Sequence, residues 1–349
     1  MGKRCSIACI IPPVLLEEMV RSGGDEDREA ALRTLSLDST LRHARTHNSL
    51  VGTPVNRTTV LQSITPGHPQ RTIHDCLGKE PPTTPKPVRN EGDPASSDIT
   101  VNEAYDGLGA TYAFFWDHFK RDSIDDQGMP LHGWVHYGRD YDNAFWDGDE
   151  MVFGDGKMFD RFTKSLDVIG HELTHGVTEH EAGLQYLNQS GALNESVSDV
   201  FGSLVKQYKL GQQAAQADWL IGADIVKPGF PGKALRSMTD PGTAFDGDNQ
   251  PANMKDYVTT MSDNGGVHTN SGIPNKAFAD LALKLGGHSW EKAGRIWYET
   301  LRDPRVRANA TFRQFAGRTT ATARRLYGTG SGEANAVVAC WKGVGVSAT

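Results

Sequence analysis

His171-Glu172-Leu173-Thr174-His175 is the stretch from which the fold and the chemistry of this 349-residue chain can be worked out. An apolar pattern with no proline across residues 162–181 predicts a helix here. Two histidines four apart on a helix lie on one face, so both can ligate a single zinc ion. The glutamate beside the first histidine can take a proton from a metal-bound water as that water attacks a carbonyl. The motif therefore predicts metal-assisted hydrolysis.

A third ligand is expected on a second helix, about twenty residues further along the chain. Catalytic zinc normally takes three protein ligands and keeps its fourth position for water. Turn residues at 188–191 precede a helical pattern in which Glu195 and Asp199 share a face. We predict that Glu195 completes the ligand set and that Asp199 accepts the second ring N–H of one ligating histidine. The alternative is that both are solvated helix acids.

The surrounding motifs indicate which kind of metal enzyme the chain resembles. A third histidine ligand of the metzincin type would need glycine at 178 and histidine at 181, where Thr178 and Glu181 stand. Instead, residues 171–179, 182–186 and 191–199 together closely resemble the thermolysin-like neutral metallopeptidases. Further matching stretches follow in the family order at 143–146, 151–156, 235–238 and 263–272. The resemblance covers roughly residues 70–349.

The resemblance implies the zinc ligands and general base named above and adds three residues to the site. His268 would stabilise the oxyanion of the tetrahedral intermediate, and Asp263 would orient its ring. Tyr186 would supply a second hydrogen-bond donor. Without its context, His268 would be interpreted as a loop histidine after an Asn-Gly-Gly turn.

The resemblance also implies how a peptide substrate is bound. Asn143 and the backbone of Ala144 would hydrogen-bond an extended peptide as an added strand, while Arg236 would clamp a substrate carbonyl. The pocket for the residue after the scissile bond would be lined by Phe159, Phe162, Val168 and Leu235. A bulky apolar side chain is then preferred there, since its burial contributes on the order of 1.5–3 kcal/mol. The alternative for these four residues is ordinary core.

The chain departs from the family where well-studied relatives bind calcium. Of the acids expected near the active site only Asp167 and Asp218 are retained, and Lys206, Leu220 and Ala223 stand at other ligand positions. A second calcium loop, between residues 224 and 236, is also altered. Because calcium needs six to eight oxygen ligands, we expect one catalytic zinc ion and an incomplete paired calcium site.

Composition limits the other classes of function. The net charge of −7 and the pI near 5.9 provide no basic patch for nucleic acid. The longest apolar runs fall far short of the roughly 20 residues that span a bilayer, so no membrane segment is predicted. Cys5, Cys9, Cys76 and Cys340 have no metal-type spacing and indicate neither a disulfide framework nor a zinc finger. The resemblance implies a monomer that acts on proteins or peptides.

The first 65 or so residues differ in composition from the rest and contain one short apolar run at residues 10–16. They do not form a convincing signal peptide, because Pro12 and Pro13 break the apolar run and no small-residue cleavage site precedes Glu17. This apolar run is similar to the Pro-Pro-hydrophobic motif in the short propeptides of the protealysin-like subgroup. That similarity implies a zymogen whose propeptide covers the cleft and is removed by autolysis; the alternative is a disordered tail. The family implies secretion, and a cytoplasmic location is the alternative.

The implied fold is α+β, a two-lobed zincin. Three parts are expected: a propeptide over residues 1–65, an N-terminal lobe over 66–180 with an antiparallel sheet and the motif helix, and a mainly helical lobe over 181–349. Aromatic segments at 134–137, 144–146 and 151–153, separated by Asp-Gly turns, predict the sheet. Within the first of these segments, His136 is interpreted as an ordinary strand histidine.

The expected function is that of a zinc-dependent neutral endopeptidase. It would cleave before bulky hydrophobic residues by attack of a zinc-bound water that Glu172 activates. A non-catalytic zinc-stabilised scaffold is a rival interpretation, but such a protein would lack Glu172 or His268, and both are present. An exopeptidase would need a group that binds the free amine of the substrate, and no such motif is recognised.

Overall fold

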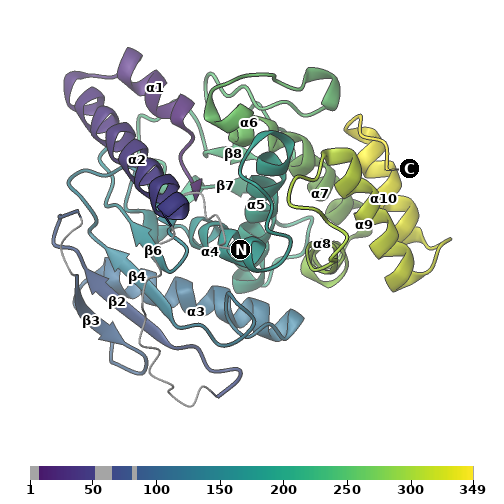
Figure 1. The fold of residues 1–349 in the computed structure, drawn as a ribbon, viewed down its shortest axis with the longest axis horizontal. Coiled ribbons are helices and arrows are strands. Elements are labelled where there is room, and N and C mark those ends of the chain that lie inside the picture. The colour runs from purple at the N-terminus through teal and green to yellow at the C-terminus, as the bar shows by residue number, and fades with distance from the viewer. Residues whose placement is uncertain (1–7, 52–64, 81–84, 349) are drawn as a thin grey trace. The chain divides into compact units, whose positions relative to one another are not determined.

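The computed structural model describes residues 8–51, 65–80 and 85–348, which divide into two compact units (Figure 1). The first unit extends to Lys164 and the second begins at Ser165. Cys5 lies outside the described residues. The predicted domain boundaries after residues 65 and 180 stay predictions. Among the described residues no helix has the length and apolar character needed to cross a membrane.

The first unit is built on a six-stranded sheet. Its strands, in spatial order, are β1 (Ala8–Cys9), β5 (Ala144–Trp146), β6 (Glu150–Phe153), β4 (Leu131–Val135), β2 (Arg71–Asp75) and β3 (Lys86–Asn90). β4 pairs parallel with β2 and β6, whereas the other neighbouring pairs are antiparallel. The sheet is therefore mixed and not antiparallel as predicted, because the chain crosses over through a helix between β3 and β4 and returns parallel to β2.

The crossover helix is α3 (Ile99–Phe119), which packs on β2 and β4. It begins where Asp98 Oδ1 accepts a hydrogen bond from the backbone N–H of Thr100 at 2.8 Å, so an exposed helix donor is satisfied. Its buried face recurs at helical spacing, as the sequence predicts, and close packing depends on Gly133 of β4. A Cβ there would stand 2.9 Å from Ile73 Cδ1 and 3.3 Å from Leu108 Cδ1.

The N-terminal residues are part of the first unit. β1 is followed by α1 (Pro13–Ser22) and α2 (Asp25–Val51), which pack against each other (Figure 1). One face of α2 is buried at positions about one turn apart, namely Ala30, Ala31, Thr34 and Asp38. The segment that the sequence marks as different in character is thus folded into helices where the structure describes it.

The second unit is mainly helical. Its helices are α4 (Leu166–His180), α5 (Asn188–Leu210), α6 (Asp263–Asn270), α7 (Gly272–Leu285), α8 (Arg295–Leu301), α9 (Phe312–Tyr327) and α10 (Gly332–Gly343). The other elements of this unit are a short hairpin of β7 (Leu220–Ile221) and β8 (Arg236–Ser237), 3-10 turns at Ala223–Ile225 and Met254–Asp256, and a π-helical turn at Trp290–Gly294. One further 3-10 turn, Phe162–Lys164, closes the first unit. The predicted α+β class is confirmed.

α4 and α5 approach each other unusually closely. A Cβ on Gly170 would stand 3.0 Å from the Cα of Gly202, and a Cβ on Gly202 would stand 2.4 Å from the backbone oxygen of Asp167. Glycine at both positions lets the two backbones meet without intervening side chains. His171 and His175, which follow Gly170 on α4, are therefore brought face to face with Asp199 and Glu195, which precede Gly202 on α5.

An aromatic cluster joins the C-terminal helices of the second unit. The rings of Trp297 and Trp341 stack with centroids 5.9 Å apart, and Phe278 lies edge-on to Trp297 at 5.1 Å. Buried Trp341 donates its indole N–H to Thr319 Oγ1 on α9 at 2.8 Å, so its polar atom is satisfied. α9 is thereby held rigidly against α8 and α10.

His136 is more than a strand histidine. It follows β4 with a φ of 54°, and its Nε2 lies 2.9 Å from Asp98 Oδ2 while its Nδ1 lies 2.9 Å from Asp155 Oδ1. The ring therefore joins the start of α3 to the segment after β6. The prediction from strand periodicity was wrong here because the two carboxylates come from distant parts of the sequence.

Protonation of His136 is expected to stabilise the first unit. The hydrogen bond with Asp155 raises its pKa, burial lowers it and Asp98 raises it again, to about 9. Because this value exceeds the roughly 6.5 of an unfolded histidine, the stabilisation is complete below about pH 6.5 and is lost as the pH rises through about 9. Allowing for solvent screening, about 1–2 kcal/mol is involved.

The measurement is the free energy of unfolding at pH 6 and above pH 9, for chains with and without His136→Gln, in a Glu172→Ala background that prevents autolysis. The difference between the two chains should shrink by about 1–2 kcal/mol at the higher pH. If the difference in unfolding free energy between the two chains is the same at both pH values, the ion pairs of His136 contribute nothing to stability.

Candidate metal centre and active site

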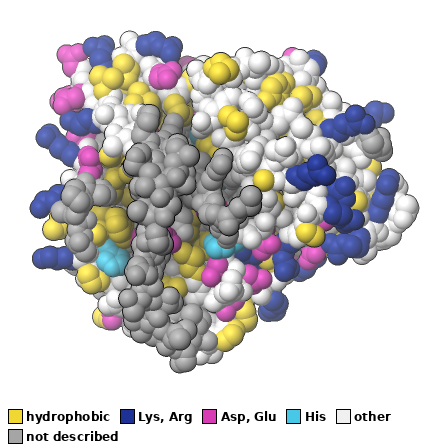
Figure 2. All heavy atoms as spheres, in the orientation of Figure 1, with side chains coloured by type: hydrophobic (Ala, Val, Ile, Leu, Met, Phe, Trp, Pro, Cys, Tyr) yellow, Lys and Arg dark blue, Asp and Glu magenta, His cyan; other side chains and the backbone are white. Residues whose placement is uncertain are grey.

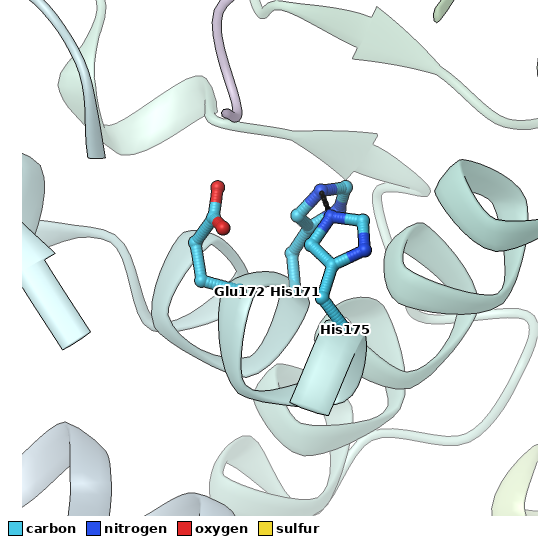
Figure 3. A group of neighbouring side chains, drawn as sticks. All are labelled: His171, Glu172 and His175. Carbon is cyan, nitrogen blue, oxygen red and sulfur yellow. Dashed lines mark hydrogen bonds between the residues drawn. The ribbon is translucent and has the colours of Figure 1, made fainter. Parts of the chain in front are cut away.

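His171, Glu172 and His175 project from the same side of α4 (Figure 3). Their ligand atoms lie within 4.8 Å of one another, and all three side chains are buried. The two Nε2 atoms of the histidines are 3.0 Å apart, with the rings nearly perpendicular. The helix predicted from the sequence therefore presents both histidine nitrogens to one point in space.

Glu195 reaches this point from α5. Its Oε2 lies 3.5 Å from His171 Nε2 and its Oε1 lies 3.5 Å from His175 Nε2. Although Glu195 is fully buried, its Oε2 accepts no hydrogen bond from the residues that the structure describes. A cation bound between this carboxylate oxygen and the two ring nitrogens would satisfy the buried oxygen. Two histidines and one glutamate are a known ligand set of catalytic zinc.

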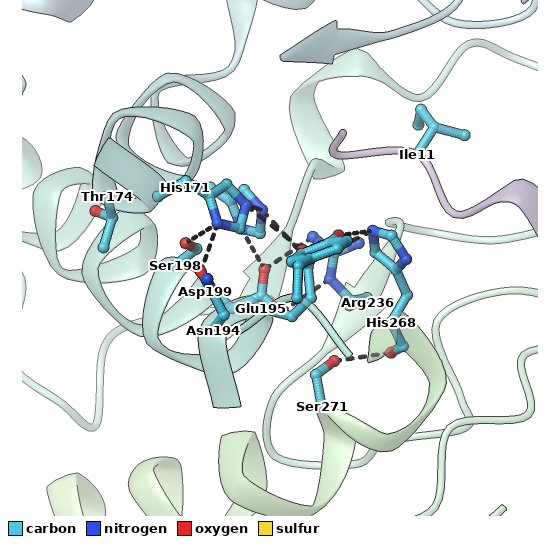
Figure 4. Close-up of polar contacts among 12 residues, drawn as sticks. Ile11, His171, Thr174, Asn194, Glu195, Ser198, Asp199, Arg236, His268 and Ser271 are labelled. Carbon is cyan, nitrogen blue, oxygen red and sulfur yellow. Dashed lines mark hydrogen bonds and ion pairs between the residues drawn. The ribbon is translucent and has the colours of Figure 1, made fainter. Parts of the chain in front are cut away.

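Asp199 fixes the orientation of His171. Its Oδ1 lies 2.8 Å from His171 Nδ1, and its two oxygens accept hydrogen bonds from Arg236 Nε and Nη2, both at 2.8 Å (Figure 4). Asp199 Oδ2 also accepts from Asn275 Nδ2 at 2.8 Å. Burial raises the pKa of Asp199, but Arg236 and His171 lower it more, so the net shift is well below the usual range. The ionised carboxylate keeps a proton on Nδ1 and leaves the Nε2 lone pair for a metal.

The structure shows that Arg236 is engaged inside the protein. It is 1% exposed and forms the paired hydrogen bonds with Asp199 described above. Its predicted contact with a substrate carbonyl stays a prediction. The sequence analysis did not predict that Asp199 pairs with Arg236 and Asn275. These residues lie on β8 and α7, which are distant from α5 in the chain, so no local pattern indicates the contact.

His175 is held by two residues of α5 that the sequence analysis did not single out. Its Nδ1 lies 2.8 Å from Asn194 Oδ1 and 3.0 Å from Ser198 Oγ. Burial lowers the pKa of His175 to about 4, so the imidazole is neutral at physiological pH and can donate a lone pair. A signal was present in the sequence, since Asn194 and Ser198 flank Glu195 on the same helix.

His268, which Figure 4 shows close to Glu195, also contacts Asp263 and Tyr186. His268 Nδ1 lies 2.7 Å from Asp263 Oδ1, and its Nε2 lies 3.2 Å from the Tyr186 hydroxyl and 3.5 Å from Glu195 Oε2. The Tyr186 hydroxyl also donates to Glu195 Oε1. Burial lowers the pKa of His268, but the charges of Asp263 and Glu195 raise it to about 9, which favours a protonated ring.

The backbone before His268 is left-handed at four successive residues, and it is strained at the two that are not glycine, Asp263 and Asn264. Asp263, Asn264, Gly265 and Gly266 all have positive φ, between 51° and 86°. A Cβ on Gly265 would stand 2.1 Å from Asn188 Oδ1, so glycine is required there. Such strain is maintained where the surroundings demand it, and here it turns the start of α6 so that Asp263 can bond His268.

The predicted substrate-binding atoms of β5 are bonded by the N-terminal segment of the same chain. Asn143 Oδ1 accepts from the backbone N–H of Ile11 at 3.1 Å, and the Ala144 carbonyl accepts from the N–H of Ile10 at 3.3 Å. The side-chain amide of Asn143 also donates to Asp38 Oδ2 on α2 at 2.9 Å. β1 continues the antiparallel pairing with β5.

The four residues predicted to line a specificity pocket are buried but belong to two units. Phe159 and Phe162 lie in the first unit, with ring centroids 6.1 Å apart. Val168 and Leu235 lie in the second unit, on α4 and just before β8. The pocket that they are predicted to share stays a prediction.

A lysine lies among the acids of the paired calcium site that the sequence predicts to be incomplete. Lys206 Nζ lies 3.1 Å from Asp167 Oδ2, 3.2 Å from Asp218 Oδ2 and 3.6 Å from Asp224 Oδ2. Burial lowers the pKa of Lys206, but these carboxylates raise it further, so the ammonium keeps its charge. An internal cation thus neutralises the carboxylates that remain of the incomplete paired site.

Loss of this ammonium should destabilise the second unit. Lys206→Met leaves buried Asp167 without a countercharge and should cost about 3 kcal/mol of unfolding free energy. Calcium should partly restore the stability of the variant, whereas neither calcium nor a calcium chelator should change the stability of the parent protein. Chemical denaturation in the Glu172→Ala background measures both effects, with the exposed Lys209→Met on the same helix as control. Calcium-dependent stability of the parent would contradict this role.

Two family models match the chain. The catalytic domain of thermolysin metallopeptidases matches residues 85–179, and their alpha-helical domain matches residues 182–346. An "Extracellular metalloprotease" of Pectobacterium carotovorum is 51% identical over 97% of this chain and 96% of its own. "Protease PrtS" of a Photorhabdus strain is 44% identical over 97% and 91%. The structure of a precursor of protealysin from Serratia proteamaculans matches with a TM-score of 0.87 at 49% identity, covering 97% of this chain and all of that one.

Proposed function

Because the chain belongs to the thermolysin family of zinc metallopeptidases, and within it resembles a protealysin precursor, we propose that it is an endopeptidase restrained by its own N-terminal segment. Family membership confirms the predicted fold and enzyme class, so the scaffold and exopeptidase alternatives lose support. The observation that carries the proposal is the convergence of His171, His175 and Glu195 on one buried point.

The chain's own residues supply proton transfer and charge stabilisation. Zinc bound by the three ligands would polarise the substrate carbonyl and acidify a water molecule. Glu172, buried beside the first ligand, takes the proton of the attacking water and later delivers it to the leaving amine. Protonated His268, with Tyr186, donates to the oxygen that becomes negative. Asp263 holds the His268 ring for this task.

We infer that cleavage falls before bulky apolar residues such as leucine, phenylalanine or isoleucine. Support comes from the apolar side chains at the family's pocket positions, all of which are buried: Phe159, Phe162, Val168 and Leu235. Transfer of a large apolar side chain into such surroundings contributes on the order of 1.5–3 kcal/mol. Backbone bonds to β5 would add affinity without dictating sequence.

The N-terminal segment is proposed to inhibit by occupying the strand position of a substrate. Ile10 and Ile11 bond the backbone of Ala144 and the side chain of Asn143, so a peptide substrate cannot form the same bonds until they leave. The segment is anchored by burial of Ile10, Ile11 and Leu16. Asp38 Oδ1 also accepts from the Tyr141 hydroxyl at 2.6 Å. Removal near residue 65 would free the edge of β5.

We further infer that the enzyme acts outside the cell, since similar proteins from Pectobacterium carotovorum and Serratia marcescens are named extracellular. The described residues contain no membrane-spanning helix.

Glu172→Gln should abolish most activity while leaving the metal site intact. Removing the general base is expected to lower kcat/KM on a denatured protein substrate by roughly 10²–10⁴-fold. Zinc content, measured by elemental analysis, should remain near one ion per chain, because the ligands are unchanged. Substantial proteolysis by this variant would refute the assignment, and loss of zinc would show a structural effect instead.

Full-length protein should trim itself in a zinc-dependent reaction. Mass spectrometry of the purified chain should show loss of the N-terminus near residue 65, blocked by a zinc chelator and by Glu172→Gln. Asp38→Asn should accelerate trimming, because the anchor of α2 on Asn143 and Tyr141 is weakened. The control, exposed Ser36→Ala on the same helix, should trim at the parental rate. Active enzyme that retains its original N-terminus would contradict the zymogen proposal.

A further inference from the structure

Arginine is concentrated in one short part of an acidic chain. Residues 302–325 contain seven arginines, no lysine and a single acid, Asp303, although the whole chain has a net charge of −7. The average composition conceals this local excess of positive charge. Figure 2 shows lysine and arginine side chains gathered over the region of α9 and the loop before it.

These arginines surround a groove of about 1040 Å³ between the loop and α9. Its charged lining consists of Arg305, Arg307, Arg313 and Arg318, and no acid lines it among the residues that the structure describes. Its apolar lining includes buried Val306 and Phe315. The groove therefore offers guanidinium groups around an apolar floor, on a helix that the aromatic cluster holds in place.

Part of this positive charge has no carboxylate partner among the described residues, although Arg302 and Arg325, outside the groove, pair with Glu181 and Glu299. Arg305 Nη2 lies 2.7 Å from Asp303 Oδ2, which accounts for the only acid of the segment. Arg307 and Arg318 have no carboxylate within ion-pair distance in the described part of the chain. Guanidinium groups match carboxylates in geometry and bind them through paired hydrogen bonds. A ligand with at least two negative charges would complement the groove.

The groove is built on the same backbone segment as Tyr186 of the active site. The carbonyl of Ala308, in the loop that lines the groove, accepts from the N–H of Gln185 at 2.7 Å. Gln189 Oε1 accepts from the N–H of Phe312, at the start of α9, at 2.8 Å. Residues 185–189 thus connect the groove to the hydroxyl that bonds Glu195 and His268. A polypeptide held in the groove would be tethered close to the catalytic residues.

We propose that this groove is an exosite that binds a short acidic segment of a protein substrate, with apolar residues between the acids. The proposal rests on the proposed peptidase function and specifies which substrates that peptidase favours. A short segment fits better than an extended polyanion or an anionic membrane. The net charge of the chain would repel a long array of negative charge, whereas only the groove contacts a short one.

Binding is tested directly with the full-length chain carrying Glu172→Ala, so that the probe is not cleaved. The probe is a short fluorescent peptide of alternating glutamate and leucine, and its reference has glutamine for each glutamate. Arg307→Gln/Arg318→Gln should raise the Kd of the acidic peptide about tenfold. Added salt should weaken binding to the parent, and the reference peptide should bind poorly. The control, Lys284→Gln/Lys342→Gln, removes two exposed charges outside the groove and should change nothing.

Hydrolysis distinguishes failure of the exosite from failure of the peptidase function. On protein substrates with and without an acidic tract, Arg307→Gln/Arg318→Gln should raise KM about tenfold for the acidic substrate only, with kcat unchanged. If the double variant has the same rise in KM on both substrates, or no rise on either, the exosite proposal is overturned while the peptidase function stands. If the parent cleaves neither substrate, the peptidase function itself fails. Binding of the double variant to the acidic peptide as tightly as the parent, or preference of the parent for anionic vesicles over that peptide, also overturns the proposal.

Discussion

The contact between α4 and α5 at Gly170 and Gly202 is the constraint on which the active site depends. With a hydrogen in place of each side chain, the two backbones approach so closely that a Cβ would meet backbone atoms at 2.4–3.0 Å. This closeness lets the short reach of Glu195 place its carboxylate 3.5 Å from both ligand nitrogens on α4. Wider helix separation would leave two histidines on one helix without their third partner.

Buried charge in the second unit is balanced group by group. Asp199 is matched by Arg236, with Asn275 satisfying a remaining lone pair, so that a carboxylate can stay ionised beside His171. In the same unit, Lys206 neutralises its cluster of carboxylates. Buried ions are tolerated only when paired and hydrogen-bonded. The pairing of Asp199 with Arg236 thereby fixes the orientation of the His171 ring.

Regulation and substrate recognition are both proposed to use the same edge of the sheet. β1 pairs with β5 and the bonds of Ile10 and Ile11 continue along that edge, which is how an extended substrate is proposed to bind. Backbone pairing does not depend on side-chain identity, so an inhibitory segment and varied substrates can use one surface. Selectivity then has to come from elsewhere, and an arginine-lined groove connected to the Tyr186 segment is suited to supply it.

The sequence by itself determined the metal motif, the helix that carries it and the family, because ligand spacing on a helix is a local property and the flanking motifs are specific. It also indicated Asp199, which lies four residues after Glu195 on one helix face. Only the tertiary structure decided what those residues touch. The Arg236–Asp199 pair, the role of Lys206 and the two carboxylates around His136 join elements far apart in the chain. The parallel strand pairs likewise followed from a crossover that periodicity does not reveal. Local patterns specify which face of an element is polar, but the partner of a buried charge is chosen by packing over long sequence distances.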